Sequence, residues 1–307
     1  MEPRGKTCKN GRTVTHDGRL CCGAGRGWAL WLGVWCLGLV SCARKPLYRT
    51  RHFSVLAFYS GKNDLAHISF DRDALAFFSA LARSRHFRFE ATHDWSRLNP
   101  DTLSRYRVLL FLDSRPEDPQ QRKAFQHYMD RGGAWMGFHF AAFALSPSAY
   151  PMNWPWYHDR FLGSGAYRSN TWRPTAAVLR VLEPRSPVMR GLPDTFRTAP
   201  SEWYRWSRDL RTDPDIRILA RIDSSSFPLG TGPRLSEIWH HGFYPVVWTN
   251  RRYHMVYFNM GHNDMDYEHR YDTTNRTLSH TFSVPAENRM ITQALFWLAA
   301  RSHYLPR

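Results

Sequence analysis

Three histidines follow apolar runs that are typical of β-strands, and their chemistry gives the first indication of a site. His67 lies shortly after the first such run of the folded body, His139 ends the fourth, and His262 follows the last. Ligands of an open parallel sheet bind outside the carboxyl ends of its strands, so these imidazoles can converge on one crevice. Glu202, in a loop before an aromatic cluster, is a fourth candidate. The sequence therefore predicts a site of three imidazoles and one carboxylate.

Two kinds of chemistry fit this set of residues. Imidazole titrates near neutral pH, so His139 and His262 can act as general acid and base while Glu202 orients them or shares the proton. Alternatively, His67, His139, His262 and Glu202 are residue types that can hold Zn²⁺ or a related divalent ion. Because the four lack the spacing of a compact metal motif, acid–base chemistry is the favoured interpretation. Each can also be purely structural, as a surface histidine or as the acid of an ion pair.

Aromatic side chains crowd the segment after His139 and indicate a platform for sugars. Trp154, Trp156 and Tyr157 are candidate substrate-binding residues, because flat rings can stack on the apolar faces of pyranoses. Asn263, next to His262, is a further candidate of the same kind. The alternative is that these rings fill the core and anchor loops, and the sequence leaves both interpretations open.

The distribution of cysteine excludes several other mechanisms. All five cysteines lie in the first 42 residues, so the remaining chain has no disulfide framework, no thiolate metal site and no cysteine nucleophile. Amidotransfer through a thioester is therefore excluded. With 43% hydrophobic and 22% charged residues, the chain has the composition of a folded protein.

The body alternates strand and helix signals in its first half, which predicts a parallel sheet with helices on both faces. Its first helix is expected to begin at Ser69, a candidate N-cap. The second half is less regular: residues 140–172 are loop-like, and a hairpin surrounds 250–252. No linker is visible, so residues 52–302 are interpreted as one α/β domain with a tail at 303–307. The expected strands are 53–59, 87–92, 108–112, 134–139, 175–182, 216–222, 245–249 and 255–259, and the expected helices are 69–85, 119–131 and 287–300.

The first 41 residues are typical of a secretory signal. A basic stretch precedes the apolar run at 27–40, which is too short to span a bilayer as a helix. The run ends in Leu-Val-Ser-Cys, which resembles a bacterial lipobox with Cys42 as the site of lipid attachment. Residues 42–51 then form a short lipidated tether. We expect a protein anchored by lipid in the bacterial cell envelope and facing the periplasm or the exterior; the alternative is an uncleaved signal anchor.

The formal net charge of +16 raises the question of nucleic acid. The arginines are scattered along the chain, no nucleic-acid motif is present, and an exported lipoprotein meets little nucleic acid. We therefore expect no nucleic-acid partner. The positive charge instead favours electrostatic attraction to anionic lipid or acidic glycans.

Several segments, taken in order, resemble the trehalose-utilisation or ThuA-like family. GGAWMGFH at 132–139 resembles the family's glycine-rich strand that ends in Gly-x-His, and the Gly-His at 261–262 resembles its closing motif. A tyrosine-centred segment at 156–163, SPVMRGLP at 186–193 and SEWY at 201–204 fall between them. The resemblance implies a flavodoxin-like, class I glutamine-amidotransferase-like fold, a three-layer sandwich with a mostly parallel central sheet.

Three positions depart from the family pattern. Ile68 stands where an acid often follows the histidine, Ser186 replaces a histidine before proline, and Ser201 replaces an aspartate before Glu202. The resemblance implies action on a sugar or 3-keto-sugar derivative, as a glycoside-processing hydrolase or lyase with His/Glu chemistry and with a divalent metal as an open alternative. The departures favour a rival interpretation, a non-catalytic carbohydrate-binding lipoprotein. A third alternative is an accessory subunit whose crevice is vestigial.

Overall fold

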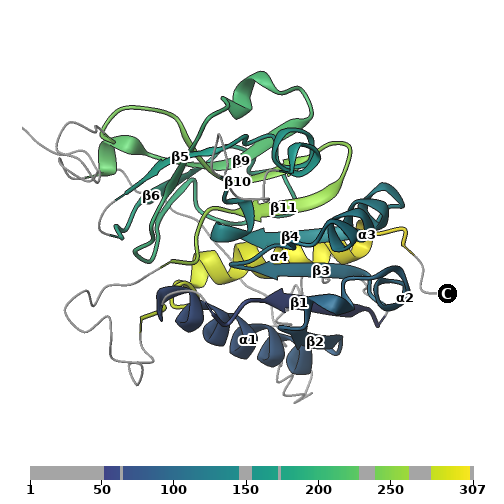
Figure 1. Cartoon of the computed structure of the whole chain (residues 1–307). Helices are drawn as coiled ribbons and strands as arrows, with labels where there is room; N and C mark the ends of the chain where they lie inside the picture. The colour runs from purple at the N-terminus through teal and green to yellow at the C-terminus, as the bar shows by residue number, and fades with distance from the viewer. Residues whose placement is uncertain are drawn as a thin grey trace, which may run out of the picture. The chain divides into compact units, whose positions relative to one another are not determined.

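A nine-stranded sheet organises the residues that the computed structural model describes, which are 52–62, 65–144, 154–171, 174–227, 239–262 and 278–304. Its strand order is β2-β1-β3-β4-β11-β10-β9-β6-β7 (Figure 1). The first five strands pair in parallel, and every pair from β11 onward is antiparallel. The strands are β1 Ser54–Tyr59, β2 Arg88–Thr92, β3 Val108–Leu112, β4 Ala134–Phe138, β6 Val178–Val181, β7 Thr195–Arg197, β9 Ile216–Ile222, β10 Tyr244–Asn250 and β11 His254–Phe258.

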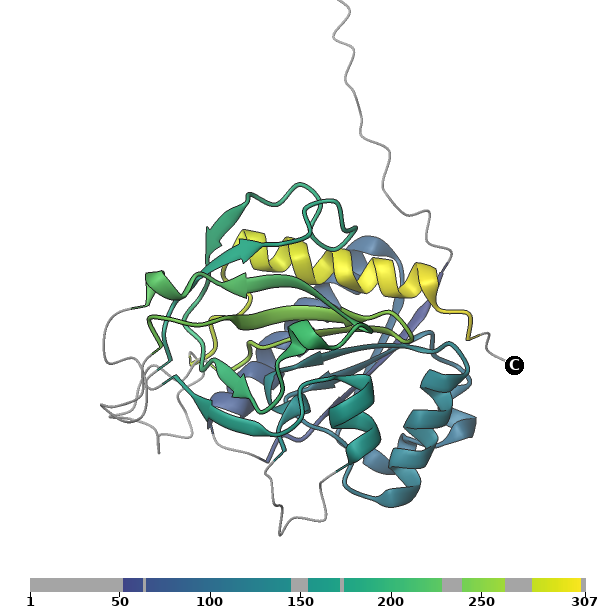
Figure 2. The same ribbon diagram turned by 90° about the horizontal axis from the view of Figure 1, so that it is seen from above.

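Helices cover both faces of the parallel half of this sheet. Helices α1 (Leu65–Arg85) and α4 (Pro285–Arg301) pack on one face, and α2 (Pro100–Leu103), α3 (Pro119–Asp130) and the π-helical segment Trp156–Phe161 pack on the other. Figure 2 shows α4 and the α3 layer on opposite sides of the strands. The predicted three-layer sandwich of the class I glutamine-amidotransferase type, with a largely parallel centre, is confirmed.

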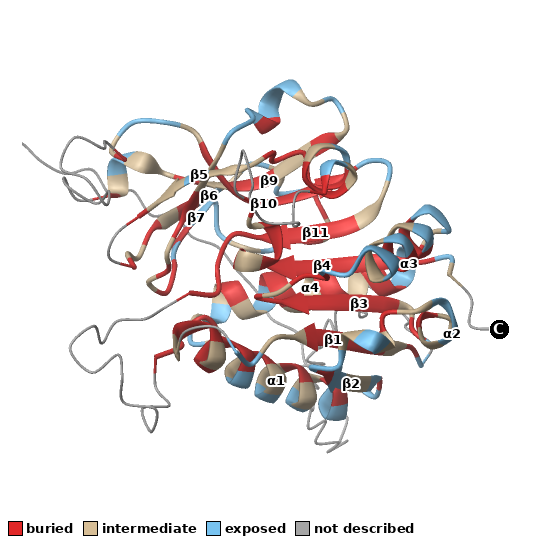
Figure 3. Ribbon diagram, viewed as in Figure 1, coloured by how far each residue is buried: buried red, intermediate tan, exposed pale blue. Residues whose placement is uncertain are grey.

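The central strands are buried along their whole length. Every residue of β3 and of β4 is buried (Figure 3). A strand covered on both faces has no solvent side to make polar, which is why these segments are continuous apolar runs rather than alternating ones. The parallel half therefore provides a closely packed support for the residues at the carboxyl ends of its strands.

Several local expectations differ from the structure. The strand expected at 175–182 is shorter, Val178–Val181, and β7 and α2 were not expected. Helix α1 begins at Leu65 and not at Ser69, because the Ser69 hydroxyl is buried and accepts a hydrogen bond from the backbone N–H of Ser279 at 2.9 Å. His67 thus lies in the first helical turn rather than in a loop. The loop-like region at 140–172 contains the strand β5 (Tyr167–Asn170), which pairs with β8 (Tyr204–Trp206) in a separate two-stranded sheet.

Several sequence-based predictions lie outside the described residues. They are the signal at 1–41, the lipid attachment at Cys42 with the tether up to residue 51, and the candidate Asn263. Among the helices that the structure describes, none has the length and apolar character needed to cross a bilayer.

Candidate functional site

The structure brings the three predicted histidines together. The ring centroids of His67 and His262 lie 4.7 Å apart, those of His139 and His262 5.5 Å, and those of His67 and His139 5.8 Å. All three side chains are buried. His139 follows β4 and His262 follows β11, which are neighbours in the sheet, while α1 carries His67 over their carboxyl ends. The cluster lies at the strand edge where open α/β sheets bind ligands.

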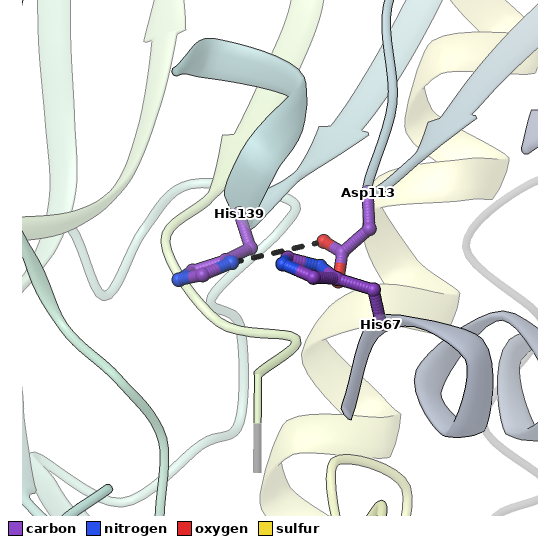
Figure 4. Close-up of side chains that lie close together, drawn as sticks. All are labelled: His67, Asp113 and His139. Atoms are coloured by element: carbon purple, nitrogen blue, oxygen red, sulfur yellow. Dashed lines mark hydrogen bonds and ion pairs between the residues drawn. The ribbon is translucent and has the colours of Figure 1, made fainter. Parts of the chain in front are cut away.

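A fourth member, Asp113, was not predicted from the sequence. It directly follows β3, and its Oδ2 lies 2.8 Å from Nδ1 of His67 (Figure 4). Its Oδ1 accepts the backbone N–H of Phe140 at 3.4 Å and lies 4.0 Å from Nδ1 of His139. The signal that could have found it is the one that found His139, because each residue ends a fully apolar strand run.

The backbone at both strand ends is strained. Asp113 has a φ of 45° and His139 a φ of 37°, in the left-handed region that residues with a Cβ seldom occupy. Such conformations cost on the order of 1–3 kcal/mol and cluster at sites where geometry matters more than stability. In Figure 4 the carboxylate of Asp113 contacts the side chains of both His139 and His67.

Gly261 makes room for this arrangement. Its φ is +143°, and a Cβ at this position would lie 2.9 Å from Oδ1 of Asp113 and 3.2 Å from Cβ of His139. Only glycine fits both the backbone conformation and the space. The glycine of the closing Gly-His pair therefore allows β11 to deliver His262 beside the other two imidazoles.

Glu202 joins the cluster from the segment before β8. Its Oε2 lies 3.7 Å from Nδ1 of His262 and 3.8 Å from Nε2 of His139, and its side chain is 13% exposed. Its Oε1 accepts a hydrogen bond from Nδ2 of Asn170 at 2.5 Å. The main chain is fixed too, because the N–H of Glu202 donates to the carbonyl of His262 at 2.9 Å. This carboxylate is thus held between two imidazoles.

The hydrogen bond at Nε2 of His139 reveals its protonation. Nε2 lies 2.9 Å from the backbone oxygen of Glu202, and since a carbonyl can only accept, Nε2 carries the hydrogen. In the neutral ring, Nδ1 is then a lone pair directed toward Asp113. The carbonyl of His139 accepts the Tyr257 hydroxyl at 2.7 Å, which holds this residue at the end of β4.

Tyr204 and Asp71 complete the surroundings. The ring of Tyr204 lies 3.9 Å from that of His139, and burial together with the charge of Glu202 raises the pKa of its hydroxyl well above the ordinary value. Asp71, one turn after His67 on α1, accepts the N–H of Gly61 at 3.1 Å. Burial, and secondarily the charge of Asp113, raises the pKa of Asp71 to about 8. The site therefore keeps a neutral phenol on one side and a carboxyl that resists ionisation on the other.

The residues also offer a ligand set for a metal ion. Single donor atoms of His67, Asp113 and His139 all lie within 4.8 Å of one another. Zinc bonds of roughly 2.0–2.1 Å in a tetrahedron put neighbouring ligands about 3.4 Å apart. In the structure Oδ2 of Asp113 lies 2.8 Å from Nδ1 of His67 and Oδ1 of Asp113 lies 4.0 Å from Nδ1 of His139, so small shifts of these side chains would be needed to surround an ion.

The predicted aromatic platform lies elsewhere. Tyr157 is fully buried and donates its hydroxyl to the carbonyl of Ala141 at 2.9 Å, Trp154 is 8% exposed and stacks on Tyr157, and Trp156 stacks on Phe161. In the part of the chain that the structure describes, none of the three aromatic candidates contacts a histidine of the cluster or Glu202. The structure brings together the four residues proposed for catalysis and leaves these rings in the core beneath α3.

The geometry defines a class of protein: a glutamine-amidotransferase-like sandwich whose strand-edge site holds imidazoles and carboxylates. The family model for ThuA, described as trehalose utilisation, matches residues 55–275. The chain belongs to this family.

Solved structures agree with this assignment. A ThuA-like protein from Bacteroides uniformis ATCC 8492 shares 28% identity with a TM-score of 0.71, covering 86% of this chain and 98% of its own. A second, from Parabacteroides merdae ATCC 43184, shares 17% identity with a TM-score of 0.55, covering 82% and 92%. A search of curated proteins finds no match.

Proposed function

We propose that this protein acts on a sugar or 3-keto-sugar derivative by acid–base chemistry. The observation that carries the proposal is the convergence of three imidazoles and two carboxylates at the carboxyl edge of β3, β4 and β11. The sugar is supported by the family, whose description is trehalose utilisation. Groups that exchange protons near neutral pH suit the removal of a proton beside a carbonyl and the departure of a glycosidic oxygen.

In this proposal the histidines have different tasks from those that the sequence suggests. The side chain of His139 is fully buried, so it acts as a positioning residue: its Nε2–H donates to the backbone carbonyl of Glu202 and holds that residue in place. His67 donates Nδ1–H to Asp113, which leaves Nε2 as a lone pair able to take a proton. His262, 3.7 Å from Glu202, is the group that returns one.

One balanced reaction fits these groups. The base His67 takes the proton from the carbon beside the ketone, the bond from the neighbouring carbon to the glycosidic oxygen breaks, and His262 protonates the leaving oxygen. The products are an unsaturated keto-sugar and the released alcohol or sugar. Asp113 stabilises the imidazolium that forms on His67, because a buried carboxylate 2.8 Å away favours the charged ring.

The test is turnover of a 3-keto-glycoside by single variants. His67→Gln and His262→Gln should each lower kcat by about 100-fold or more, the usual range for an acid or base. Glu183→Gln is the control, since this partly exposed acid pairs with Arg217 and plays no part in the site. Full activity in both histidine variants would show the assignment to be wrong.

A metal-assisted version is favoured by one specific observation, the grouping of donor atoms from His67, Asp113 and His139. Those residues would hold the ion, which would polarise a carbonyl or hydroxyl of the substrate. Metal analysis of the purified protein tests this: about one equivalent of bound divalent ion in the wild type, lost in Asp113→Asn, supports it. A metal-free protein with full activity contradicts it and leaves the acid–base version standing.

We also propose that the chain is exported and anchored by lipid on Cys42, on the basis of the Leu-Val-Ser-Cys sequence alone. Metabolic labelling with a fatty acid should mark the wild type and not Cys42→Ser. Equal labelling of both would refute the anchor.

A further inference from the structure

Arg115 is a buried cation without a counter-ion. It follows the carboxyl end of β3, two residues after Asp113, and is only 5% exposed. Its Nη1 donates to the backbone carbonyl of Phe140 at 3.1 Å, whereas its Nε is buried and has no hydrogen-bond partner among the described residues. Within the described ranges of the chain, no carboxylate forms an ion pair with its guanidinium. Because a charge buried without a partner is costly, this group requires an anion.

The acids of the neighbouring turn do not supply that anion. Glu117 and Asp118 are exposed at the start of α3, and Oδ1 of Asp118 accepts the N–H groups of Gln120 and Gln121 at 2.8 and 3.0 Å as the cap of that helix. Burial lowers the pKa of Arg115 to about 10, so its guanidinium is still charged near pH 7. The chain therefore holds a full positive charge in its interior.

Two further basic side chains flank Arg115. The guanidinium of Arg122 lies 5.6 Å from the ring centroid of Trp154, its Nε donates to the carbonyl of Pro116 at 3.2 Å, and its Nη2 is buried without a hydrogen bond to the described chain. His158 is 4% exposed, and its Nε2 is likewise buried and unpartnered among the residues described. Burial, and next the charge of Arg115, lowers the pKa of His158 to about 3. Three basic groups thus face one another, and each has an unused nitrogen.

A short turn places these groups beside the histidine cluster. Arg115 binds the carbonyl of Phe140, and Tyr157 of the π-helical segment donates its hydroxyl to the next carbonyl, that of Ala141, at 2.9 Å. The guanidinium of Arg115 lies 5.3 Å from the ring centroid of Phe140, and the centroids of the Phe140 and His67 rings lie 5.2 Å apart. One aromatic ring therefore separates the buried cation from the imidazoles.

A cavity of about 190 Å³ lies against the π-helical segment. His158 and Trp154 line it, together with Asp159 and Arg208, which pair with each other at 3.5 Å. The acid and the arginine of this lining compensate one another, so neither cancels the charge of the buried groups. The volume is below that of a site for a drug-sized molecule and is enough for one small oxyanion.

We propose that Arg115, with Arg122 and His158 beside it, binds a small oxyanion of the phosphate or carboxylate type. A guanidinium presents a planar edge of N–H donors that matches two oxygens of either group. The anion supplies both the missing counter-charge and acceptors for the unused nitrogens. This inference is independent of the proposed reaction, because it stands on the charges and donors of these three side chains.

The experiment is calorimetric titration of the full chain at pH 7 and low ionic strength with two probes, inorganic phosphate and acetate. At least one probe should bind with a Kd below about 10 mM, and added sodium chloride should weaken it. Arg115→Met should bind about tenfold more weakly or less, because it loses hydrogen bonds to a charged group. It should remain folded, since an apolar chain of similar length replaces an unpaired buried charge. Arg88→Gln, whose side chain is 68% exposed, should bind like the wild type.

The two probes distinguish the source of the oxyanion, and tighter binding of either one supports the site and identifies its group. The inference is overturned if neither probe reaches a Kd of about 10 mM, or if Arg115→Met binds as tightly as the wild type. If Arg115→Met does not fold, Arg122→Gln at its partly buried position makes the same comparison. That variant should bind at least about threefold more weakly, and an unchanged affinity would overturn the inference.

Discussion

Replacing Gly261 by alanine is the sharpest test of how the site is packed. The added methyl would meet Oδ1 of Asp113 at 2.9 Å, Cβ of His139 at 3.2 Å and a ring carbon of Phe70 at 3.3 Å. Overpacking a buried position costs about 1–3 kcal/mol. A φ of +143° adds about 1–3 kcal/mol for a residue with a Cβ. Together the free energy of unfolding should fall by about 2–6 kcal/mol.

Urea unfolding followed by circular dichroism measures this loss, and the melting temperature should fall by roughly 5–20 °C for a domain of this size. Gly61→Ala is the control, because Gly61 also has a positive φ, of +64°, but its added methyl meets nothing closer than 3.5 Å. That variant should lose only about 1–2 kcal/mol, the cost of the backbone alone. A Gly261→Ala protein within about 0.5 kcal/mol of the wild type would refute the close approach of β11 to Asp113.

Three further predictions concern buried groups away from the site. Burial raises the pKa of Glu287 to about 8, so its protonated form stabilises the fold fully below about pH 4.5, and this stabilisation is lost as the pH rises to about 8. In urea unfolding between pH 5 and 8, Glu287→Gln should therefore show a smaller fall in the free energy of unfolding with pH than the wild type does. Burial lowers the pKa of His158 to about 3, so its neutral form stabilises the fold above about pH 6.5, and this stabilisation is lost as the pH falls toward 3. His158→Gln should reduce the loss of the free energy of unfolding in acid. An unchanged dependence of stability on pH would contradict the lowered pKa of His158. Trp154→Ala should lower the free energy of unfolding by about 3–5 kcal/mol because it removes a buried ring, and a stable variant with weakened sugar binding would restore the platform interpretation.

The sequence predicts the parallel half well because burial on both faces leaves a strong pattern. The run at 108–112 matches β3 and the run at 134–139 overshoots β4 by one residue, which is His139 itself. The same rule, a polar residue at the end of an apolar strand, leads to His139 and applies equally to Asp113. Asp113 was missed because an aspartate after a strand is also a common turn residue.

Other features depend on contacts that no local pattern contains. The start of α1 is displaced from Ser69 because that hydroxyl serves a residue over two hundred positions away. The aromatic segment around Trp154 has the same composition whether it faces sugar or core, and packing against α3 decides the matter. The pairing of β5 with β8, which carries Asn170 to Glu202, follows from tertiary structure rather than from strand propensity.

The position of Glu202 outside the main sheet has a consequence for how such proteins can diversify. The imidazoles lie on α1 and just after β4 and β11, whereas Glu202 precedes β8 of the two-stranded β5–β8 ribbon. Hydrogen bonds of 3.2 and 2.9 Å between Tyr204 and Asn259 join this ribbon to the main sheet. The ribbon is thus an exchangeable module: a relative can change the acid and its reach while the imidazole scaffold stays in place. New specificities can then arise by changes in this ribbon alone, without changes in the strands and helices that carry the imidazoles.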